Sequence, residues 1–129
     1  MQQKYMEMQL LEQKIKQVQS QLHAITNQLF EIDATIGYVN EFKELKKGSE
    51  TLVPLSNGIF FKTTLKENDS FIVNVGAGVA VNKTPENLNE MLDKQKEELA
   101  DVQKRLLVHL ERLGVQAQKT EEELAKLVQ

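Results

Sequence analysis

Few residues in this chain have side chains and spacings that could support catalysis or bind a metal ion. The two histidines, His23 and His109, are far apart, and neither has a histidine or carboxylate at a spacing that completes a metal site. The chain contains no cysteine, which excludes a thiol nucleophile, a disulfide and a cysteine-ligated zinc ion. We therefore interpret both histidines as structural residues on helices, and we expect no metal ion and no other cofactor.

Two glycine-containing segments carry part of a catalytic or nucleotide-binding pattern. Gly76-Ala77-Gly78 has the first two glycines of a dinucleotide fingerprint, but the third glycine and the following helix are missing. Ser56-Asn57-Gly58 offers a serine hydroxyl, but no partnering base lies nearby. Both segments are better interpreted as turns, and Glu121–Glu123 as a solvated helix face. We therefore expect that the protein is not an enzyme.

The composition favours long helices over a thick globular core. The chain has 129 residues, of which 27% are charged and only 5% aromatic. The net charge of −3, without a long basic cluster, argues against nucleic acid as the main partner. No apolar run approaches the roughly 20 residues that span a bilayer, and the N-terminus is typical of a helix rather than a signal peptide. We expect a soluble cytoplasmic protein without membrane contacts.

The first part of the chain has the repeat of a coiled coil. From Met8 to Val39, apolar residues alternate at spacings of three and four, which predicts a supercoiled helix. The helix is expected over residues 1–47, with a glycine stop at Gly48. The seam consists of Met8, Leu11, Ile15, Val18, Leu22, Ile25, Leu29, Ile32, Ile36 and Val39.

A second helix is expected over residues 84–129. Thr84 can cap it and Pro85 suits its first position. An extra step between Leu106 and Leu110 is a stutter, which locally unwinds a supercoil. The seam consists of Leu88, Leu92, Gln95, Leu99, Val102, Leu106, Leu110, Leu113, Ala117, Thr120, Leu124 and Leu127.

The two seams match when the helices run in opposite directions. Val39 then faces Leu92, Ile25 faces Leu106, and Val18 faces Leu113, with polar interruptions at Gln95 and Thr120. The sequence therefore predicts a mostly helical α+β fold. It is a long antiparallel two-helix coiled coil with a β-module at one end and both chain termini at the other.

The β-module occupies residues 51–82. Asn57-Gly58 tolerates the positive φ of a type I′ turn, and Gly76–Gly78 marks a second turn, so two β-hairpins are expected. Isolated hairpins are marginal in water, and the helix seams are committed to each other. We expect the same module of other chains to cover the apolar strand faces.

The terminal ends of the helices carry more apolar residues than the seams require. Tyr5, Met6 and Leu10 surround Met8, and Val128 adjoins Leu127. Flexible, exposed apolar side chains suit adaptable contact with non-native apolar segments of other proteins. The alternative is that frayed ends carry stray hydrophobic residues, which are normal when exposed singly.

Two segments of the β-module carry a resemblance to a known family. Leu52-Val53-Pro54-Leu55, and Val73–Gly78 followed by Val79-Ala80-Val81, resemble the α-type subunit of prefoldin. The order helix, two hairpins, helix covers the whole chain, and two hairpins distinguish α-type from β-type subunits. Ser56-Asn57-Gly58 departs from the family, which more often has a glycine-richer turn. The short chain without extensions is expected to be archaeal.

The resemblance implies a function and an assembly. Prefoldin is a heterohexamer of two α-type and four β-type subunits, whose hairpins form a double β-barrel. Its coiled-coil ends hold unfolded proteins without ATP and pass them to a group II chaperonin. The implied assembly residues are Leu52, Val53, Ile59, Phe61, Leu65, Phe71, Val73, Val75, Val79 and Val81. The implied client-binding residues are Tyr5, Met6, Met8, Leu10, Leu124, Leu127 and Val128. The alternative is a structural scaffold that oligomerises through its hairpins and only spaces its partners.

Overall fold

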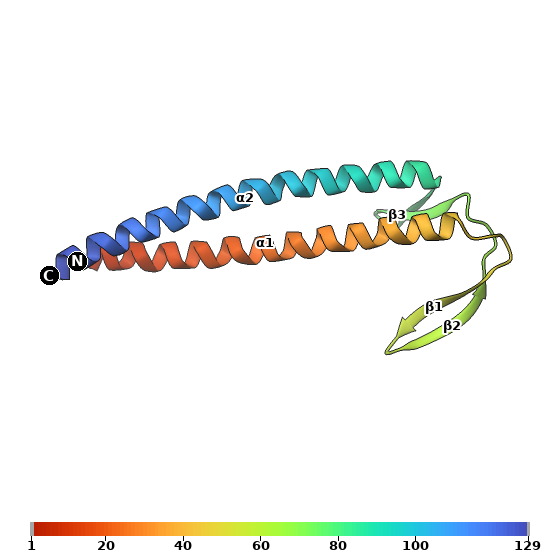
Figure 1. Cartoon of the computed structure of the whole chain (residues 1–129), viewed down its shortest axis with the longest axis horizontal. Coiled ribbons are helices and arrows are strands. Elements are labelled where there is room, and N and C mark those ends of the chain that lie inside the picture. The colour runs from red at the N-terminus through yellow and green to blue at the C-terminus, as the bar shows by residue number, and fades with distance from the viewer. Residues whose placement is uncertain (1, 129) are drawn as a thin grey trace. The chain divides into compact units, whose positions relative to one another are not determined.

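The computed structural model describes residues 2–128 and contains two long helices with two small antiparallel hairpins between them, as the sequence predicts (Figure 1). The chain forms two compact units. The first unit combines two segments, the residues before Ile32 and the residues after Gln95. The second unit is the continuous segment Ile32–Gln95. In chain order the elements are α1 (Gln2–Lys43), β1 (Glu50–Ser56), β2 (Ile59–Thr64), β3 (Phe71–Gly76), β4 (Val79–Lys83) and α2 (Pro85–Val128).

Helix α1 ends at Lys43, earlier than residue 47, the end that the sequence suggests. Its last turn tightens, because the amide nitrogens of Glu44 and Leu45 donate to carbonyls three residues back, each at 3.2 Å. The chain then turns at Gly48, whose φ of 85° favours a residue without a side chain. The helix therefore ends in a tightened turn after Lys43, and the predicted glycine turn follows at Gly48.

In the first unit, the beginning of α1 and the end of α2 lie side by side in opposite directions (Figure 1). Val18 and Leu113 are its most buried apolar residues, at 5% and 4% exposure. Ile25 and Leu106 line the same small cleft, as the antiparallel match predicts. The side-chain amide of Gln103 donates to Thr26 Oγ1 at 3.4 Å, which adds a polar contact between the helices.

The predicted α2 seam is less regular than the predicted α1 seam. Every α1 seam residue is buried or half-buried, but on α2 Gln95 is exposed and Val102 is 36% exposed. The neighbouring Gln103 is half-buried in place of Val102. A helix with 3.6 residues per turn drifts relative to a strict heptad, and the stutter after Leu106 is where the pattern recovers.

The core of the second unit lies where the two helices meet the β-module. Val39, Leu88 and Leu92 form a buried cluster. Partly buried apolar residues pack against it from both helices and from β3, and they are Ile32, Ile36, Met91, Phe71 and Val73. At the start of α2, Thr84 Oγ1 accepts a hydrogen bond from the Asn87 amide at 3.1 Å, which confirms the predicted cap.

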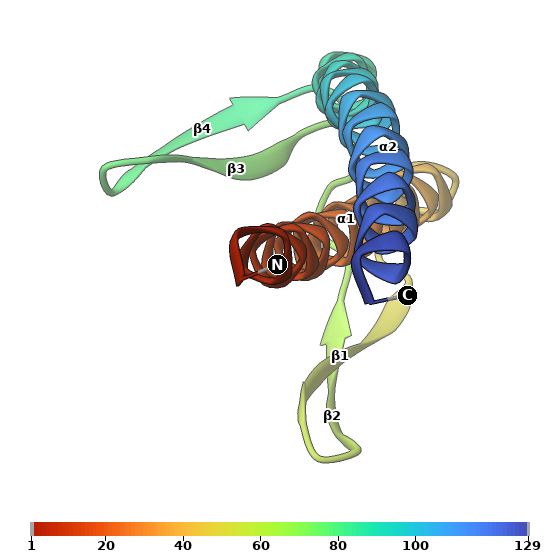
Figure 2. The same ribbon diagram turned by 90° about the vertical axis from the view of Figure 1, so that its left-hand side faces the viewer.

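The two hairpins are separate two-stranded sheets (Figure 2). β1 pairs with β2 through Val53–Phe61, and β3 pairs with β4 through Val73–Val81. Both turns have positive φ at two central residues, 52° and 75° at Asn57-Gly58 and 53° and 74° at Ala77-Gly78. In each hairpin the register shifts just before the turn, between Pro54 and Ser56 and between Asn74 and Gly76. Strands β1 and β3 are therefore each bulged before their turn, which increases the local twist of these strands.

The base of the first hairpin is fixed to the end of α1. The Gly48 amide donates to the Leu65 carbonyl and the Leu65 amide donates to the Ser49 carbonyl, each at 2.8 Å. The side-chain amide of Asn68 donates to the carbonyls of Phe42 and Lys43, each at 3.0 Å, and also to that of Leu45. Phe42 and Lys43 are the last two residues of α1, whose carbonyls lack the usual hydrogen bond from the amide four residues on. Asn68 therefore caps α1 from the loop between the hairpins.

Candidate functional site

The residues implied for client binding fall into two groups in the structure. Five are more than half exposed, among them the predicted seam residue Leu127, and the other two, both seam residues, are half-buried. The exposed group consists of Tyr5, Met6, Leu10, Leu127 and Val128. Met8 and Leu124 are half-buried instead. We refer to residues 2–11 of α1 and 116–128 of α2 as the paired helix ends. Here the five exposed side chains offer apolar area to solvent, while Met8 and Leu124 are partly covered.

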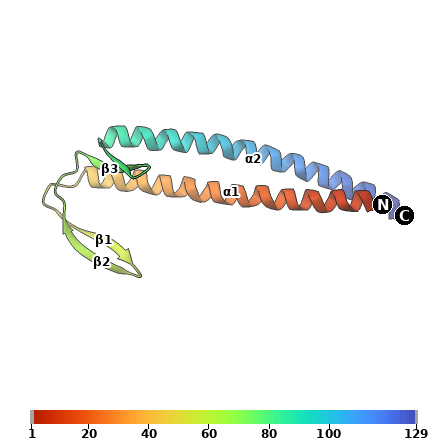
Figure 3. The same cartoon turned by 180° about the vertical axis from the view of Figure 1, so that it is seen from behind.

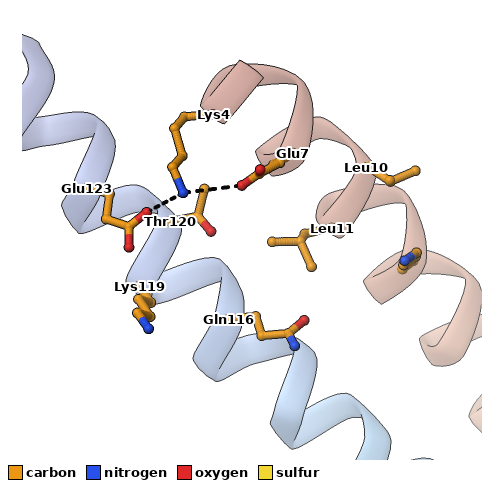
Figure 4. Close-up of a pocket in the computed structure, with 9 residues that line it drawn as sticks. Lys4, Glu7, Leu10, Leu11, Gln116, Lys119, Thr120 and Glu123 are labelled. Atoms are coloured by element: carbon orange, nitrogen blue, oxygen red, sulfur yellow. Dashed lines mark hydrogen bonds and ion pairs between the residues drawn. The ribbon is translucent and has the colours of Figure 1, made fainter. Parts of the chain in front are cut away.

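An ion pair links the paired helix ends. The Lys4 ammonium lies 2.6 Å from the Glu123 carboxylate on α2 and 3.5 Å from Glu7 on its own helix (Figure 4). The hydrogen bond to Glu123 raises the pKa of Lys4, and the same bond lowers the pKa of the Glu123 carboxyl. Both groups therefore stay charged at neutral pH. The sequence pattern did not reveal this pair, because its side chains flank the seam rather than occupy it.

An open groove of about 350 Å³ lies beside this ion pair (Figure 4). Leu10 and Leu11 line it from α1, and Thr120 lines it from α2. Thr120 is only 8% exposed, so the threonine occupies the seam near Leu11, as the antiparallel match predicts. A small polar residue at a seam position leaves room where a leucine would fill the space.

The hairpins expose many of the residues implied for assembly. Leu52, Ile59, Phe61, Val75 and Val79 are 45% to 61% exposed. The other five are half-buried, and they are Val53, Leu65, Phe71, Val73 and Val81.

Three exposed apolar residues of the hairpins fall outside the expected set: Leu55, Phe60 and Ile72, at 63%, 55% and 78% exposure. Leu55 lies at the bulge of β1, while Phe60 and Ile72 lie on the strand faces opposite those that the sequence pattern emphasised. Strand alternation could have identified Phe60 and Ile72, because apolar residues continue on both faces. Both faces of these hairpins therefore offer apolar surface.

Residues 2–128 contain no group of three or more side chains suited to hold a metal ion. His23 is exposed on α1, and His109 is exposed on α2 rather than packed near the seam. Within the same residues, no helix is both long enough and apolar enough to cross a membrane.

The sequence of the chain matches a known family along most of its length. The family model described as "Prefoldin subunit" matches residues 11–129. "Prefoldin subunit alpha" of Methanosarcina acetivorans is 32% identical over 120 residues, which cover 91% of this chain and 84% of that protein. The protein of the same description from Thermofilum pendens is 28% identical over 104 residues, which cover 81% of each chain.

The fold is also shared with a solved prefoldin structure. A chain in the cryo-EM structure of filamentous PFD from Methanocaldococcus jannaschii superposes with a TM-score of 0.77. The match covers 92% of this chain and 95% of that chain, at 15% identity, so it shows the fold alone. The sequence matches carry the assignment further: the chain belongs to the prefoldin family, as a subunit of the alpha type.

Proposed function

We propose that this chain is an ATP-independent chaperone subunit that captures unfolded proteins at its paired helix ends. Prefoldin subunits are chaperone subunits rather than enzymes. The observation that carries the proposal is the exposed apolar surplus formed by Tyr5, Met6, Leu10, Leu127 and Val128. Side chains of this kind can contact many apolar segments without fixed complementarity, and methionine adapts its shape to each of them.

The proposal includes an assembly through the hairpins. Two copies of this chain would join four β-type subunits, and the hairpins would close into intersubunit β-barrels. The exposed apolar faces of β1–β2 and the exposed Ile72 support this assembly, because water-exposed hairpins of this kind are marginal alone. Prefoldin subunits oligomerise with one another, as the filamentous structure from Methanocaldococcus jannaschii illustrates.

In this proposal the chain is a single subunit with three regions. Helices α1 (Gln2–Lys43) and α2 (Pro85–Val128) would form the coiled coil, and residues 51–82 would serve assembly. The hexamer would work in the cytoplasm, most simply of an archaeon, and would pass its clients to a group II chaperonin. Family membership supports these steps, since the curated relatives of this chain come from archaea.

The test removes the exposed apolar residues from the paired helix ends. Tyr5, Met6, Leu10 and Val128 are replaced together by serine, and the assembled complex is mixed with a chemically denatured enzyme during dilution. Light scattering is expected to show that the wild-type complex suppresses aggregation and that the variant loses most of this effect. Native mass spectrometry must show the same subunit composition for both, so that loss of assembly does not explain the result.

A matched control removes exposed aromatic surface elsewhere on α1. Phe30 and Tyr38 are 76% and 61% exposed and lie outside the paired helix ends. The double substitution Phe30→Ser/Tyr38→Ser is expected to leave suppression intact. If the wild-type complex has no effect on aggregation, the scaffold alternative is favoured, because buried seams and long helices would serve a spacer equally well. If the variant with four serines at the paired helix ends suppresses aggregation as well as the wild type, client capture occurs elsewhere.

A further inference from the structure

Helix α2 carries a second repeating pattern on the side opposite its seam. Its residues alternate at spacings of three and four, so they lie in one band along the helix, about 100° to 180° around the axis from the line of Leu106, Leu113 and Ala117. All of them are exposed. The members are Arg105, Val108, Arg112, Val115 and Lys119, and we call this set the basic stripe.

The two valines of the basic stripe are not explained by packing within the chain. Val108 is 48% exposed and Val115 is 63% exposed, one heptad apart. Single exposed apolar residues are ordinary. Here two exposed valines lie one heptad apart, between cations that repeat at the same spacing. This is the pattern of a helix surface that packs against another helix.

Charge is segregated along α2, and the basic stripe lies in its cationic part. Between Val102 and Thr120 the cations Lys104, Arg105, Arg112 and Lys119 accompany a single carboxylate, Glu111. Among residues 2–128 none of these four cations forms an ion pair within 4 Å. The chain as a whole is acidic, with a net charge of −3. Lys119 is close enough to Glu123 to help lower the pKa of that carboxyl, so the least compensated positive charge lies at Lys104, Arg105 and Arg112.

We propose that the basic stripe is a docking surface for an acidic amphipathic helix of a partner protein. The cations Arg105, Arg112 and Lys119 repeat every heptad, or about 10.5 Å along the helix. Carboxylates at the same repeat on a partner helix would meet them in register, while apolar residues between those carboxylates would contact Val108 and Val115. Charge complementarity requires a negatively charged partner surface. The single line of valines is narrow enough to be covered by one helix.

Two other classes of partner fit the basic stripe less well. Single-stranded nucleic acid is held by aromatic side chains that stack on bases, and residues 102–120 contain no phenylalanine, tyrosine or tryptophan. Anionic membranes bind helices with a broad apolar face rich in large residues. Here the apolar residues on the line are two valines flanked by cations.

The first experiment uses designed peptides and the full chain in its assembled form. One peptide is an amphipathic helix with glutamates at heptad spacing flanking leucines, and the second has the same composition in scrambled order. The valine and leucine methyl groups of the chain are labelled for NMR. Binding of the first peptide is expected to shift the signals of Val108 and Val115, to weaken as salt is raised, and to be absent for the scrambled peptide.

A pair of charge-reversal variants separates the basic stripe from general electrostatics. Arg105→Glu/Arg112→Glu is expected to weaken binding of the acidic peptide at least about tenfold. Lys16→Glu/Lys94→Glu changes the net charge equally at exposed positions outside the stripe, and it is expected to keep the wild-type affinity. Circular dichroism checks that both variants remain helical.

Three results would overturn the proposal. The first is an equal loss of affinity in both double variants. The second is methyl shifts outside residues 104–119. The third is binding of a poly(U) oligonucleotide or of phosphatidylglycerol vesicles through Arg105 and Arg112 in preference to the peptide. The variant with serines at Tyr5, Met6, Leu10 and Val128 should still bind the peptide, so this inference and the proposed client capture can fail separately.

Discussion

The two hairpins share their local chemistry but differ in what covers them. Each has a turn with two residues at positive φ, and each has a bulge just before that turn. The β3 strand places Phe71 and Val73 on the buried cluster of Val39, Leu88 and Leu92. No residue of β1 or β2 belongs to that cluster, and this hairpin is drawn clear of the helix segments of its own unit (Figure 3).

The difference shows that turn chemistry decides whether a hairpin forms, while burial decides where it is held. The second hairpin is positioned by its own chain, because one face rests on the ends of the helices. Within residues 2–128, the hydrogen bonds that join the first hairpin to the rest of its unit lie at its base, and they are Gly48–Leu65, Leu65–Ser49 and those of the neighbouring Asn68. Its apolar faces are exposed in this chain and could be covered by another subunit, in agreement with the proposed assembly.

The largest expected effect comes from removing the contact that covers the second hairpin. Phe71→Ala should lower the free energy of unfolding of the isolated chain by about 2 kcal/mol, since its ring is half-buried against the core cluster. Phe61→Ala in the first hairpin should change it by less than about 0.5 kcal/mol, because Phe61 is 45% exposed and outside the cluster. Urea unfolding followed by circular dichroism measures both.

Ile72→Ala is the control for this comparison. Ile72 neighbours Phe71 on β3 but is 78% exposed, so its loss should leave the stability of the isolated chain unchanged. Equal destabilisation by Phe71→Ala and Phe61→Ala would show that both hairpins are held by the chain itself. In native mass spectra of the complex, Phe61→Ala should reduce assembly although it leaves the chain folded.

A smaller effect is expected from releasing the base of the first hairpin. Asn68→Ala removes the amide that donates to carbonyls at the end of α1, which should cost about 1 kcal/mol. Asn74→Ala removes only the acceptor of the Gly76 amide within the second turn and should cost about half as much. Hydrogen exchange at the Leu45 and Leu65 amides should accelerate in the first variant alone, and comparable acceleration in both would refute the capping role.

The smallest effect concerns pH, and it should leave the contrast between the hairpins untouched. The folded-state pKa of Glu123 is lowered, so its stabilising contribution is present above the ordinary carboxyl pKa and is lost as pH falls through the lower, folded-state value. The pKa of Lys4 is raised, so its contribution is present below the ordinary lysine pKa and is lost as pH rises through the higher, folded-state value.

Hydrogen exchange of amides in the first turns of α1 measures this pH effect. After correction for intrinsic exchange, protection should fall at both pH extremes in the wild-type chain. Glu123→Gln should lack the change at acid pH, and Glu122→Gln, on an exposed neighbour, should retain it. If Glu123→Gln still lost amide protection at acid pH to the same extent, another carboxyl would be responsible for the pH effect at the helix ends.

The helices, their antiparallel match and both turns could be predicted from the sequence, because each has a local signal. The heptad repeat from Met8 to Val39 marks one buried line, and Thr84-Pro85 marks a helix start. The turn pair Asn57-Gly58 has the positive φ that its residue types favour. In these places the local preference and the final packing agree.

The remaining features depend on contacts between distant residues, which leave no periodic signal. Asn68 caps a helix that ended more than 20 positions earlier, so it looks like an ordinary loop residue in the sequence. The exposure of Val102 and the partial burial of Gln103 follow from the drift of a helix with 3.6 residues per turn relative to strict heptads. Which hairpin packs on the core is likewise a tertiary outcome, because the apolar patterns of the two hairpins are similar.

The fixed base of the first hairpin has a consequence for the way this chain can vary. Gly48 and Leu65 close a loop whose ends are already brought together, and the loop tip at Asn57-Gly58 contacts no core residue. Adding residues at such a tip increases the entropic cost of closing the loop only slowly with loop length. The first hairpin can therefore be lengthened, shortened or fused to another peptide while the helices and the second hairpin keep their fold, which makes it the natural place to insert a label.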